Sequence, residues 1–283
     1  METRRIGDIA VSAIGLGGMP MSIEGRPDEE RSVRTIHAAL DAGITLIDTA
    51  DSYHIHADEV GHNEALIARA LATYGGDKSS VLVATKAGHL RPGDGSWTLD
   101  GSPSYIFQAC EESLKRLGVD AIDLYQYHRP DPRVPWADSI GAIRDLLDAG
   151  KIRMAGVSNA NPAQIREARD ILGGRLVSVQ NQFSPSFLSS APELSLCDEL
   201  GIAFLSWSPL GGIRRAGSLG GGFATVAERH GVSPQRVCLA WHLAKSPYVI
   251  PIPGSSRPET IRDSYTATDL ELTPDQLATL DAA

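Results

Sequence analysis

Several features are scarce in this 283-residue chain, and cysteine is the first of them. The three cysteines, Cys110, Cys197 and Cys238, are far apart and odd in number, and each lies in a helix-like segment. This spacing suits neither a disulfide framework nor a set of metal ligands. We therefore expect the thiols to pack as small hydrophobic side chains in a reducing, cytoplasmic compartment.

Basic residues are also in the minority, with 26 Lys and Arg against 35 Asp and Glu and a net charge of −9. Nucleic-acid phosphates require a basic surface, so no nucleic-acid partner is expected. No apolar run approaches the ~20 residues of a membrane span. Arg4 and Arg5 are not followed by an uninterrupted apolar core, which argues against a secretory signal.

What the chain does contain is a regular alternation of short apolar runs and helix-like segments. The apolar runs, rich in Val, Ile and Leu, are 14–17, 44–48, 81–85, 121–127, 152–158, 176–180, 202–207 and 248–253. The helices predicted after them are, in the same order, 28–42, 61–73, 103–117, 136–149, 161–171, 192–200, 223–230 and 257–264. Alternation of this kind indicates a parallel sheet with helical crossovers.

Eight such units in a chain of this length favour a closed (β/α)₈ barrel over a doubly wound sheet. We expect one barrel domain over residues 1–283, because no linker divides the chain. A β-hairpin is predicted near 4–15, and extra helices at 234–245 and 274–281, the last packed against the outside of the barrel. Gly15–Gly18 do not form a dinucleotide fingerprint, because the third glycine and the Rossmann unit are missing.

Polar residues come at or just after the ends of three early strands: Asp48 and Tyr53, Lys86, and His128. In an α/β barrel the strand ends are where the chemistry is located. For carbonyl reduction, a phenol such as Tyr53 can donate the proton, and a nearby ammonium lowers its pKa. Asp48 can pair with Lys86, and His128 can donate a hydrogen bond to the carbonyl oxygen. Each residue alone has ordinary structural explanations, but their combination indicates a proton-delivery site.

At these residues the chain resembles the aldo-keto reductase family, and the resemblance covers nearly all of it. The segments that carry it are, in family order, IDTADSY with GHNEALIARAL, VATKAG, DLYQYHRPD, KIRMAGVSN, VQNQFSP, SWSPLGG and IPIPGSSRPETIRDS. The resemblance implies a (β/α)₈ barrel, the catalytic tetrad Asp48, Tyr53, Lys86 and His128, and NADPH as cofactor, with NADH possible but weaker. The Gly-rich loop after Trp207 is similar to that of the bacterial pyridoxal reductase branch.

The resemblance also implies a set of cofactor-binding residues. These are Gly18, Met19, Asp48, Ser158, Asn159, Gln180, Trp207, Ser208, Leu210, Gly211, Gly254, Ser255, Ser256, Arg257, Thr260, Asp263 and Ser264. Ser158, Asn159 and Gln180 match the groups that bind the nicotinamide carboxamide, and Trp207 the aromatic that stacks on its ring. Arg257 matches a phosphate-binding position. Thr260 and Ser264 depart from the Arg and Asn of many relatives, which weakens the expected preference for NADPH.

The predicted substrate pocket is lined by Met19, His54, Trp97, Arg129 and Phe183, all from loops that follow strands. Its polar members favour a small polar or aromatic aldehyde, pyridoxal included. No metal site is expected, because His54, His56 and His62 form no closed ligand set. Two alternatives stay open: a cofactor-sensing regulatory protein like the potassium-channel β subunits, and a metal-dependent barrel hydrolase. The expected partner is a small carbonyl compound, bound by a monomer or weak homo-oligomer.

Overall fold

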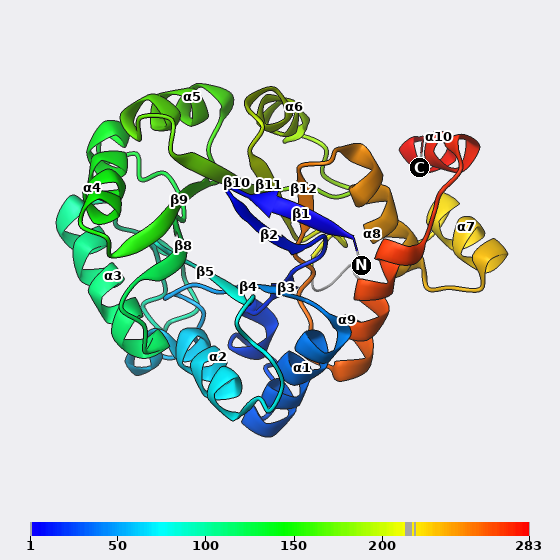
Figure 1. Cartoon of the computed structure of the whole chain (residues 1–283), viewed down its shortest axis with the longest axis horizontal. Helices are drawn as coiled ribbons and strands as arrows, with labels where there is room; N and C mark the ends of the chain where they lie inside the picture. Colours follow the sequence, from blue (N-terminus) through cyan, green and yellow to red (C-terminus); the bar gives the residue numbers. More distant parts are fainter. Residues whose placement is uncertain (1, 213–216, 218, 283) are drawn as a thin grey trace.

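A computed structural model describes residues 2–212, 217 and 219–282, and parallel strands form its centre. Within these residues eight parallel strands make one sheet, in the order β12-β11-β10-β9-β8-β5-β4-β3. Their bounds are β3 (Leu16–Gly17), β4 (Leu46–Asp48), β5 (Leu82–Ala87), β8 (Ile122–Tyr127), β9 (Ile152–Ser158), β10 (Leu176–Gln182), β11 (Ala203–Trp207) and β12 (Val249–Pro251). In Figure 1 these strands form a ring around the centre of the barrel.

The first and last strands close the barrel. Gly15 N donates to Pro251 O and Gly17 N donates to Pro253 O, both at 3.0 Å, and Gly17 also bridges to Gly254. Glycine is required at this seam, because a Cβ on Gly17 would lie 2.8 Å from Ile252 O. The predicted (β/α)₈ barrel is confirmed, although β3 and β12 are shorter than the apolar runs predicted for them.

Helices surround the sheet, with each strand-to-strand connection outside it (Figure 1). Their bounds are α1 (Glu29–Ala42), α2 (His62–Thr73), α3 (Pro103–Leu117), α4 (Trp136–Asp148), α5 (Pro162–Ile171), α6 (Ala191–Leu200), α7 (Gly222–His230), α8 (Pro234–Lys245), α9 (Pro258–Tyr265) and α10 (Pro274–Asp281). Asn161, Ser233 and Thr273 each cap a helix that begins with proline, as their dipeptides predict. Among the described residues no helix is both long and apolar enough to cross a membrane.

Two details differ from the sequence prediction. The helix that covers the barrel after β11 is α8, which packs on β12, whereas α7 lies further out and contacts α8 and α10 (Figure 1). Seven consecutive residues of α8, Val237–Leu243, are buried, so its sequence is too uniformly apolar to show one helical face. The structure also has a short hairpin that the sequence did not reveal, β6 (His89–Leu90) with β7 (Thr98–Leu99), because its strands have two residues each.

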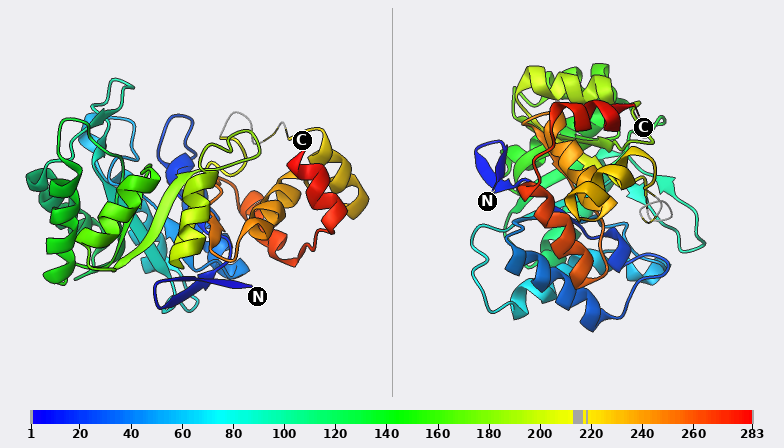
Figure 2. Two further views of the ribbon diagram at one scale, coloured as in Figure 1. Left: turned by 90° about the horizontal axis from the view of Figure 1, so that it is seen from above. Right: turned by 90° about the vertical axis from the view of Figure 1, so that its right-hand side faces the viewer.

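The predicted N-terminal hairpin, β1 (Thr3–Ile6) with β2 (Ile9–Ser12), closes one end of the barrel. Figure 2 shows it at the end opposite the loops that follow the strands. Ile6 and Val11 are buried in the same cluster as Leu46, Leu124 and Leu205, which fills the barrel interior. The hairpin therefore covers the end of the barrel where the strands begin, which in α/β barrels serves stability. The loops that follow the strands occupy the other end.

We expect Ile6→Ala to destabilise the protein by about 2–4 kcal/mol, because it empties a buried site beneath the barrel. Ile9→Ala is the matched control: Ile9 pairs with Ile6 in the hairpin register but is 39% exposed. Its cost should stay below about 1 kcal/mol. Urea unfolding of both variants measures the difference. Equal losses in the free energy of unfolding would show that burial of Ile6 in the barrel does not stabilise the fold.

Candidate active site

The four predicted site residues come together at the carboxyl ends of neighbouring strands. Asp48 ends β4, Lys86 lies in β5, His128 directly follows β8, and Tyr53 lies in the loop after β4. Since β4, β5 and β8 are consecutive in the sheet, the side chains converge. All four are buried, and Lys86 is 0% exposed. A polar cluster buried this deeply needs its own partners to offset the lost hydration.

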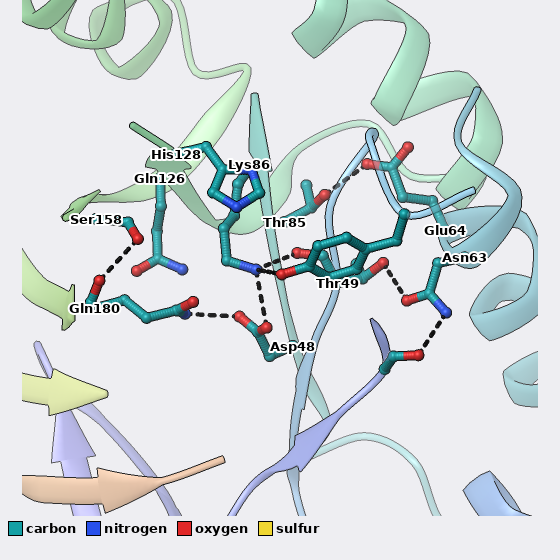
Figure 3. Close-up of polar contacts among 12 residues, drawn as sticks. Asp48, Thr49, Asn63, Glu64, Thr85, Lys86, Gln126, His128, Ser158 and Gln180 are labelled. Atoms are coloured by element: carbon teal, nitrogen blue, oxygen red, sulfur yellow. Dashed lines mark hydrogen bonds and ion pairs between the residues drawn. The ribbon is translucent and has the colours of Figure 1, made fainter. Parts of the chain in front are cut away.

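Lys86 holds the cluster together (Figure 3). Its Nζ donates to Asp48 Oδ2 at 2.8 Å, to Thr49 O at 2.7 Å and to Tyr53 Oη at 3.0 Å. These three acceptors satisfy the three N–H bonds of an ammonium. Asp48 Oδ1 accepts from Gln180 Nε2 at 2.7 Å, which ties the cluster to β10.

The electrostatics keep Lys86 charged. Burial by itself lowers the pKa of Lys86, but Asp48 and Tyr53 outweigh it, so the pKa lies above its ordinary value. Burial raises the pKa of Asp48, and the charge of Lys86 with the hydrogen bonds from Lys86 and Gln180 oppose that rise. The pair is therefore an ion pair whose members depend on each other.

Tyr53 differs from the sequence prediction in one respect. Its pKa is raised, because burial disfavours the phenolate more than Lys86 favours it. Lys86 opposes this rise but does not reverse it. The phenol thus keeps its proton at neutral pH, while the bond from Lys86 stabilises the phenolate that remains after donation. A proton donor needs both properties.

His128 is electrically neutral in this setting. Its pKa lies well below the ordinary value because of burial, and because Lys86, His89 and Arg129 add positive charge nearby. The imidazole meets the Tyr53 ring edge-on, with centroids 5.9 Å apart and planes at 81°. Its buried Nδ1 has no partner among the described residues. A neutral imidazole can hydrogen-bond a substrate oxygen without competing for the proton.

A cavity of about 190 Å³ opens beside the tetrad. It is lined by three of the predicted catalytic residues, Asp48, Tyr53 and His128, by the predicted cofactor residues Met19, Ser158, Asn159, Gln180, Trp207, Ser208, Leu210 and Gly254, and by Gly17, Pro20, His89, Trp97, Arg129, Pro209, Gly212, Ile252 and Pro253. Many of the residues predicted from separate segments of sequence thus face one space. The apolar walls with a few convergent polar groups are typical of a cofactor and ligand site.

The lining fits a nicotinamide dinucleotide. Asn159 Nδ2 donates to His128 O at 3.0 Å, and Gln180 Nε2 is engaged by Asp48, which leaves two side-chain oxygens as acceptors for a carboxamide. Trp207 lines the cavity, and its buried Nε1 has no partner among the described residues. Asn159 and Ser208 have φ values of 57° and 50°, a conformation that non-glycine residues rarely adopt. Such strain is concentrated at functional sites.

The remaining predicted cofactor residues do not line this cavity. Gly18 N donates to Asp48 O at 2.8 Å, and Gly211 N donates to Ser208 O at 2.9 Å. Ser255, Ser256 and Arg257 precede α9, and Thr260 bonds the Arg257 carbonyl at 2.9 Å.

Asp263 and Ser264 lie on α9. Asp263 pairs with Arg236 of α8 at 2.5 Å, and Ser264 is buried. Asp263 thus connects α9 to α8, and the role of both residues in binding the cofactor stays a prediction.

Three of the predicted substrate-pocket residues, Met19, Trp97 and Arg129, line the cavity, and two do not. His54 is buried beneath the loop, where its Nδ1 lies 2.7 Å from His56 O. Phe183 packs on Trp241 in parallel, with ring centroids 5.7 Å apart, and lines a separate cavity near α6, α8 and α10. The structure therefore does not bring His54 and Phe183 to the cavity, because position in a loop does not show which way a side chain turns.

The sequence did not reveal His89, which lines the cavity and stacks on Trp97 with centroids 4.5 Å apart. Nor did it reveal the polar support behind the cluster. Asn63 Oδ1 accepts from Thr49 Oγ1 at 2.7 Å, and Asn63 Nδ2 donates to Gly18 O at 2.9 Å (Figure 3). The Gly-x-Asn-Glu segment after Tyr53 was a signal for this support, since Asn63 and Glu64 are both fully buried polar residues at the start of α2.

Fold and cluster together are those of a barrel oxidoreductase. The chain belongs to the aldo/keto reductase family, whose model matches residues 13–283, so the resemblance seen in the sequence is confirmed.

Relatives agree with this. An uncharacterized oxidoreductase of Schizosaccharomyces pombe is 34% identical over 285 positions, covering 99% of this chain and 89% of the relative. A 6-dehydroglucose reductase of Novosphingobium aromaticivorans is 34% identical over 269 positions, covering 92% and 87%.

Solved structures are also similar. The glycerol dehydrogenase of Gluconobacter oxydans superposes with a TM-score of 0.84 at 28% identity, covering 99% of this chain and 94% of that chain. An aldo/keto reductase of Klebsiella pneumoniae, in complex with NADP and acetate, has a TM-score of 0.82 at 25% identity, with the same coverage.

Behind the tetrad, Asp51 is a buried carboxyl group that the site chemistry does not use. Its Oδ2 accepts from Tyr105 Oη at 2.8 Å, and its buried Oδ1 has no partner among the described residues. Burial, with the nearby carboxylate of Glu64, raises the pKa of Asp51 to about 7, while Tyr105 and Arg116 of α3 oppose that rise. Asp51 therefore stays protonated in the folded protein well above pH 4.

Asp51→Asn should remove a pH dependence of stability. Because the pKa of Asp51 rises from 3.8 to about 7 on folding, its stabilising effect is complete at acidic pH and is lost as pH rises through 7. The free energy of unfolding changes by about 1.4 kcal/mol per pH unit for one such group. The variant's free energy of unfolding, relative to that of wild type, should therefore rise by roughly 3–4 kcal/mol between about pH 4.5 and pH 7.5.

Urea unfolding across this range measures the gain, with Asp170→Asn, at an exposed position on α5, as the control. A wild-type to Asp51→Asn difference that stays constant with pH would show that Asp51 is ionised throughout.

Proposed function

We propose that the protein is an NADPH-dependent reductase that converts aldehydes or ketones to alcohols, with Tyr53 as the general acid. The observation that carries the proposal is the 3.0 Å hydrogen bond from Lys86 to the buried phenol of Tyr53, beside a cavity. Family membership and relatives that include a 6-dehydroglucose reductase and a glycerol dehydrogenase support carbonyl chemistry. The expected substrates are small polar or aromatic aldehydes, pyridoxal among them.

Each residue of the tetrad has a separate task in this proposal. A bound nicotinamide dinucleotide would provide the hydride. Tyr53 donates its Oη proton to the carbonyl oxygen as negative charge develops there. Lys86 stabilises the resulting phenolate, and Asp48 holds Lys86 in its charged form. Neutral His128 donates a hydrogen bond to the same oxygen and orients the substrate.

The cofactor would be held by the groups that line the cavity. Asn159 and Gln180 offer acceptors to the carboxamide, and Trp207 offers an aromatic face to the ring. Arg257 is half-exposed at the N-terminus of α9 and lies 3.7 Å from Glu259. A helix N-terminus and a guanidinium both favour a phosphate, so Arg257 is the candidate for the 2′-phosphate of NADPH.

Tyr53→Phe should lower turnover about 10²–10⁴-fold, because it removes the general acid. Cofactor affinity, followed by fluorescence titration, should change only a few-fold. Tyr74→Phe, which removes a phenol bonded to Asp41 and remote from the cavity, should leave both unchanged. A Tyr53→Phe enzyme with most of its turnover would show that the proton donor is another group.

Arg257→Ala should raise the KM for NADPH about ten-fold or more and barely change the KM for NADH, since a charge-assisted hydrogen bond contributes about 1.5–3 kcal/mol. The effect should shrink at high salt. Arg262→Ala, exposed on the same helix, is the control. Steady-state kinetics with both cofactors decide the matter: equal losses would exclude Arg257 as the reader of the 2′-phosphate.

A further inference from the structure

Arg129 is a half-buried cation on the wall of the cavity, one residue after His128. Its charge influences Tyr53, His89 and His128, so the guanidinium lies close to the proton-delivery groups. Its Nε is buried and has no hydrogen-bond partner among the residues the structure describes.

The neighbouring carboxylates are all engaged by other groups. Asp131, only two residues further along, accepts from Arg133 Nη2 at 2.8 Å and from Gly101 N at 3.1 Å. Asp48 is paired with Lys86. Across residues 2–212, 217 and 219–282, no ion pair with Arg129 is found.

As far as the structure describes it, the rest of the cavity wall carries no second uncompensated charge. Burial, with nearby Arg129 and Arg91, lowers the pKa of His89 to about 4, so its imidazole is neutral at physiological pH. Arg91 lies over the Trp97 ring, 4.7 Å from the centroid, but it pairs with Glu24. Among the described residues the cavity therefore has an aromatic floor at Trp97 and one free positive charge at Arg129.

A half-buried guanidinium without a counter-ion is unfavourable for the free protein. Its hydration is reduced, no carboxylate in the described part of the chain compensates it, and it cannot release its proton at physiological pH. An anion that enters the cavity would restore the missing interaction. Guanidinium groups suit carboxylates and phosphates in particular, because their N–H groups can bind two oxygens at once.

The position of Arg129 separates it from the proposed phosphate contacts of the cofactor. Arg129 follows β8, whereas Gly254 and Arg257 follow β12. In the closed sheet order, β8 and β12 have three strands between them on either side, so they face each other across the barrel. The anion that Arg129 suits would lie on the substrate side, next to His128.

We propose that Arg129 anchors an anionic group of the substrate, so that the preferred carbonyl compound is an aldehyde or ketone that carries a carboxylate or a phosphate. This inference rests on the proposed reductase function and specifies its substrate class. Trp97 adds a flat apolar surface beside the anchor, which suits a short or aromatic body between the carbonyl and the anion.

A matched pair of substrates tests the anchor. Reduction of 4-carboxybenzaldehyde is compared with that of its neutral methyl ester, in wild type, Arg129→Met and Arg153→Met. The last variant removes an exposed arginine on β9 and so makes the same change in net charge. Wild type should show the lower KM for the acid. Arg129→Met should raise that KM about ten- to a hundredfold, with kcat nearly unchanged, and leave the ester within about three-fold.

Two further arms identify the anion and control for folding. Glyceraldehyde 3-phosphate against glyceraldehyde, in the same variants, shows whether phosphate or carboxylate gains more from Arg129. Arg129→Lys keeps the charge and should retain part of the preference. Arg129→Met should melt no lower than wild type, because it removes a charge without a partner.

The outcomes separate this inference from the proposed function. If wild type reduces acid and ester equally, and glyceraldehyde as well as its phosphate, the anchor is refuted while the reductase stands. If no carbonyl compound is reduced, the reductase itself fails, and calorimetric titration of benzoate and benzamide onto the unliganded protein decides the anchor alone. Benzoate binding that Arg129→Met abolishes supports it, and identical binding by both proteins overturns it.

Discussion

The site depends on a single buried ammonium. Lys86 has no exposure to solvent, yet its three N–H bonds meet a carboxylate, a backbone carbonyl and a phenol. Burial of this charge without partners would cost several kcal/mol, so the surrounding residues are constrained to stay where they are. Asp48 must remain ionised, Thr49 must present its carbonyl, and Tyr53 must keep its ring against β5. The position of the Tyr53 phenol is thus a consequence of solvating one cation.

Burial and nearby positive charge also set the protonation state of the histidines in the cavity. Burial, with positive charge from Lys86 and Arg129, lowers the pKa of His128 and keeps it neutral. Burial, with Arg129 and Arg91, does the same for His89. Neutral imidazoles can orient an oxygen without taking its proton. The cavity then has a compensated cation at the tetrad and an uncompensated one at Arg129. This difference separates Lys86, proposed to support the proton donor, from Arg129, proposed to select the substrate.

The barrel separates the apolar side chains that stabilise the fold from the charged side chains of the site. The hairpin with Ile6 and Val11 fills one end with apolar side chains, and the seam at Gly17 closes the sheet. The buried charged cluster lies at the other end, where α2 and α3 provide a second layer: Glu64 accepts from Thr85 and Arg116 at 2.6 Å. Asp51 is part of this layer, a buried acid whose neutral form suits its surroundings. The apolar end stabilises a framework that can hold buried charge at the opposite end.

The barrel and the convergence of the tetrad residues could be predicted from the sequence, because both follow from short, regular sequence patterns. Apolar runs of strand length alternate with capped helices, and Asp48, Lys86 and His128 come at the ends of consecutive strands, which parallel pairing must bring together.

The direction in which loop side chains turn became clear only from the tertiary structure. His54 and Phe183 looked like pocket residues and pack elsewhere, whereas His89 enters the cavity from a hairpin too short to predict. Tertiary structure also decided how charges pair: Asp131 binds Arg133 rather than Arg129, and burial raises the pKa of Tyr53 despite Lys86. The reason is physical, since a periodic pattern fixes which face of a strand is buried, while loop orientation and desolvation depend on contacts between residues distant in the chain.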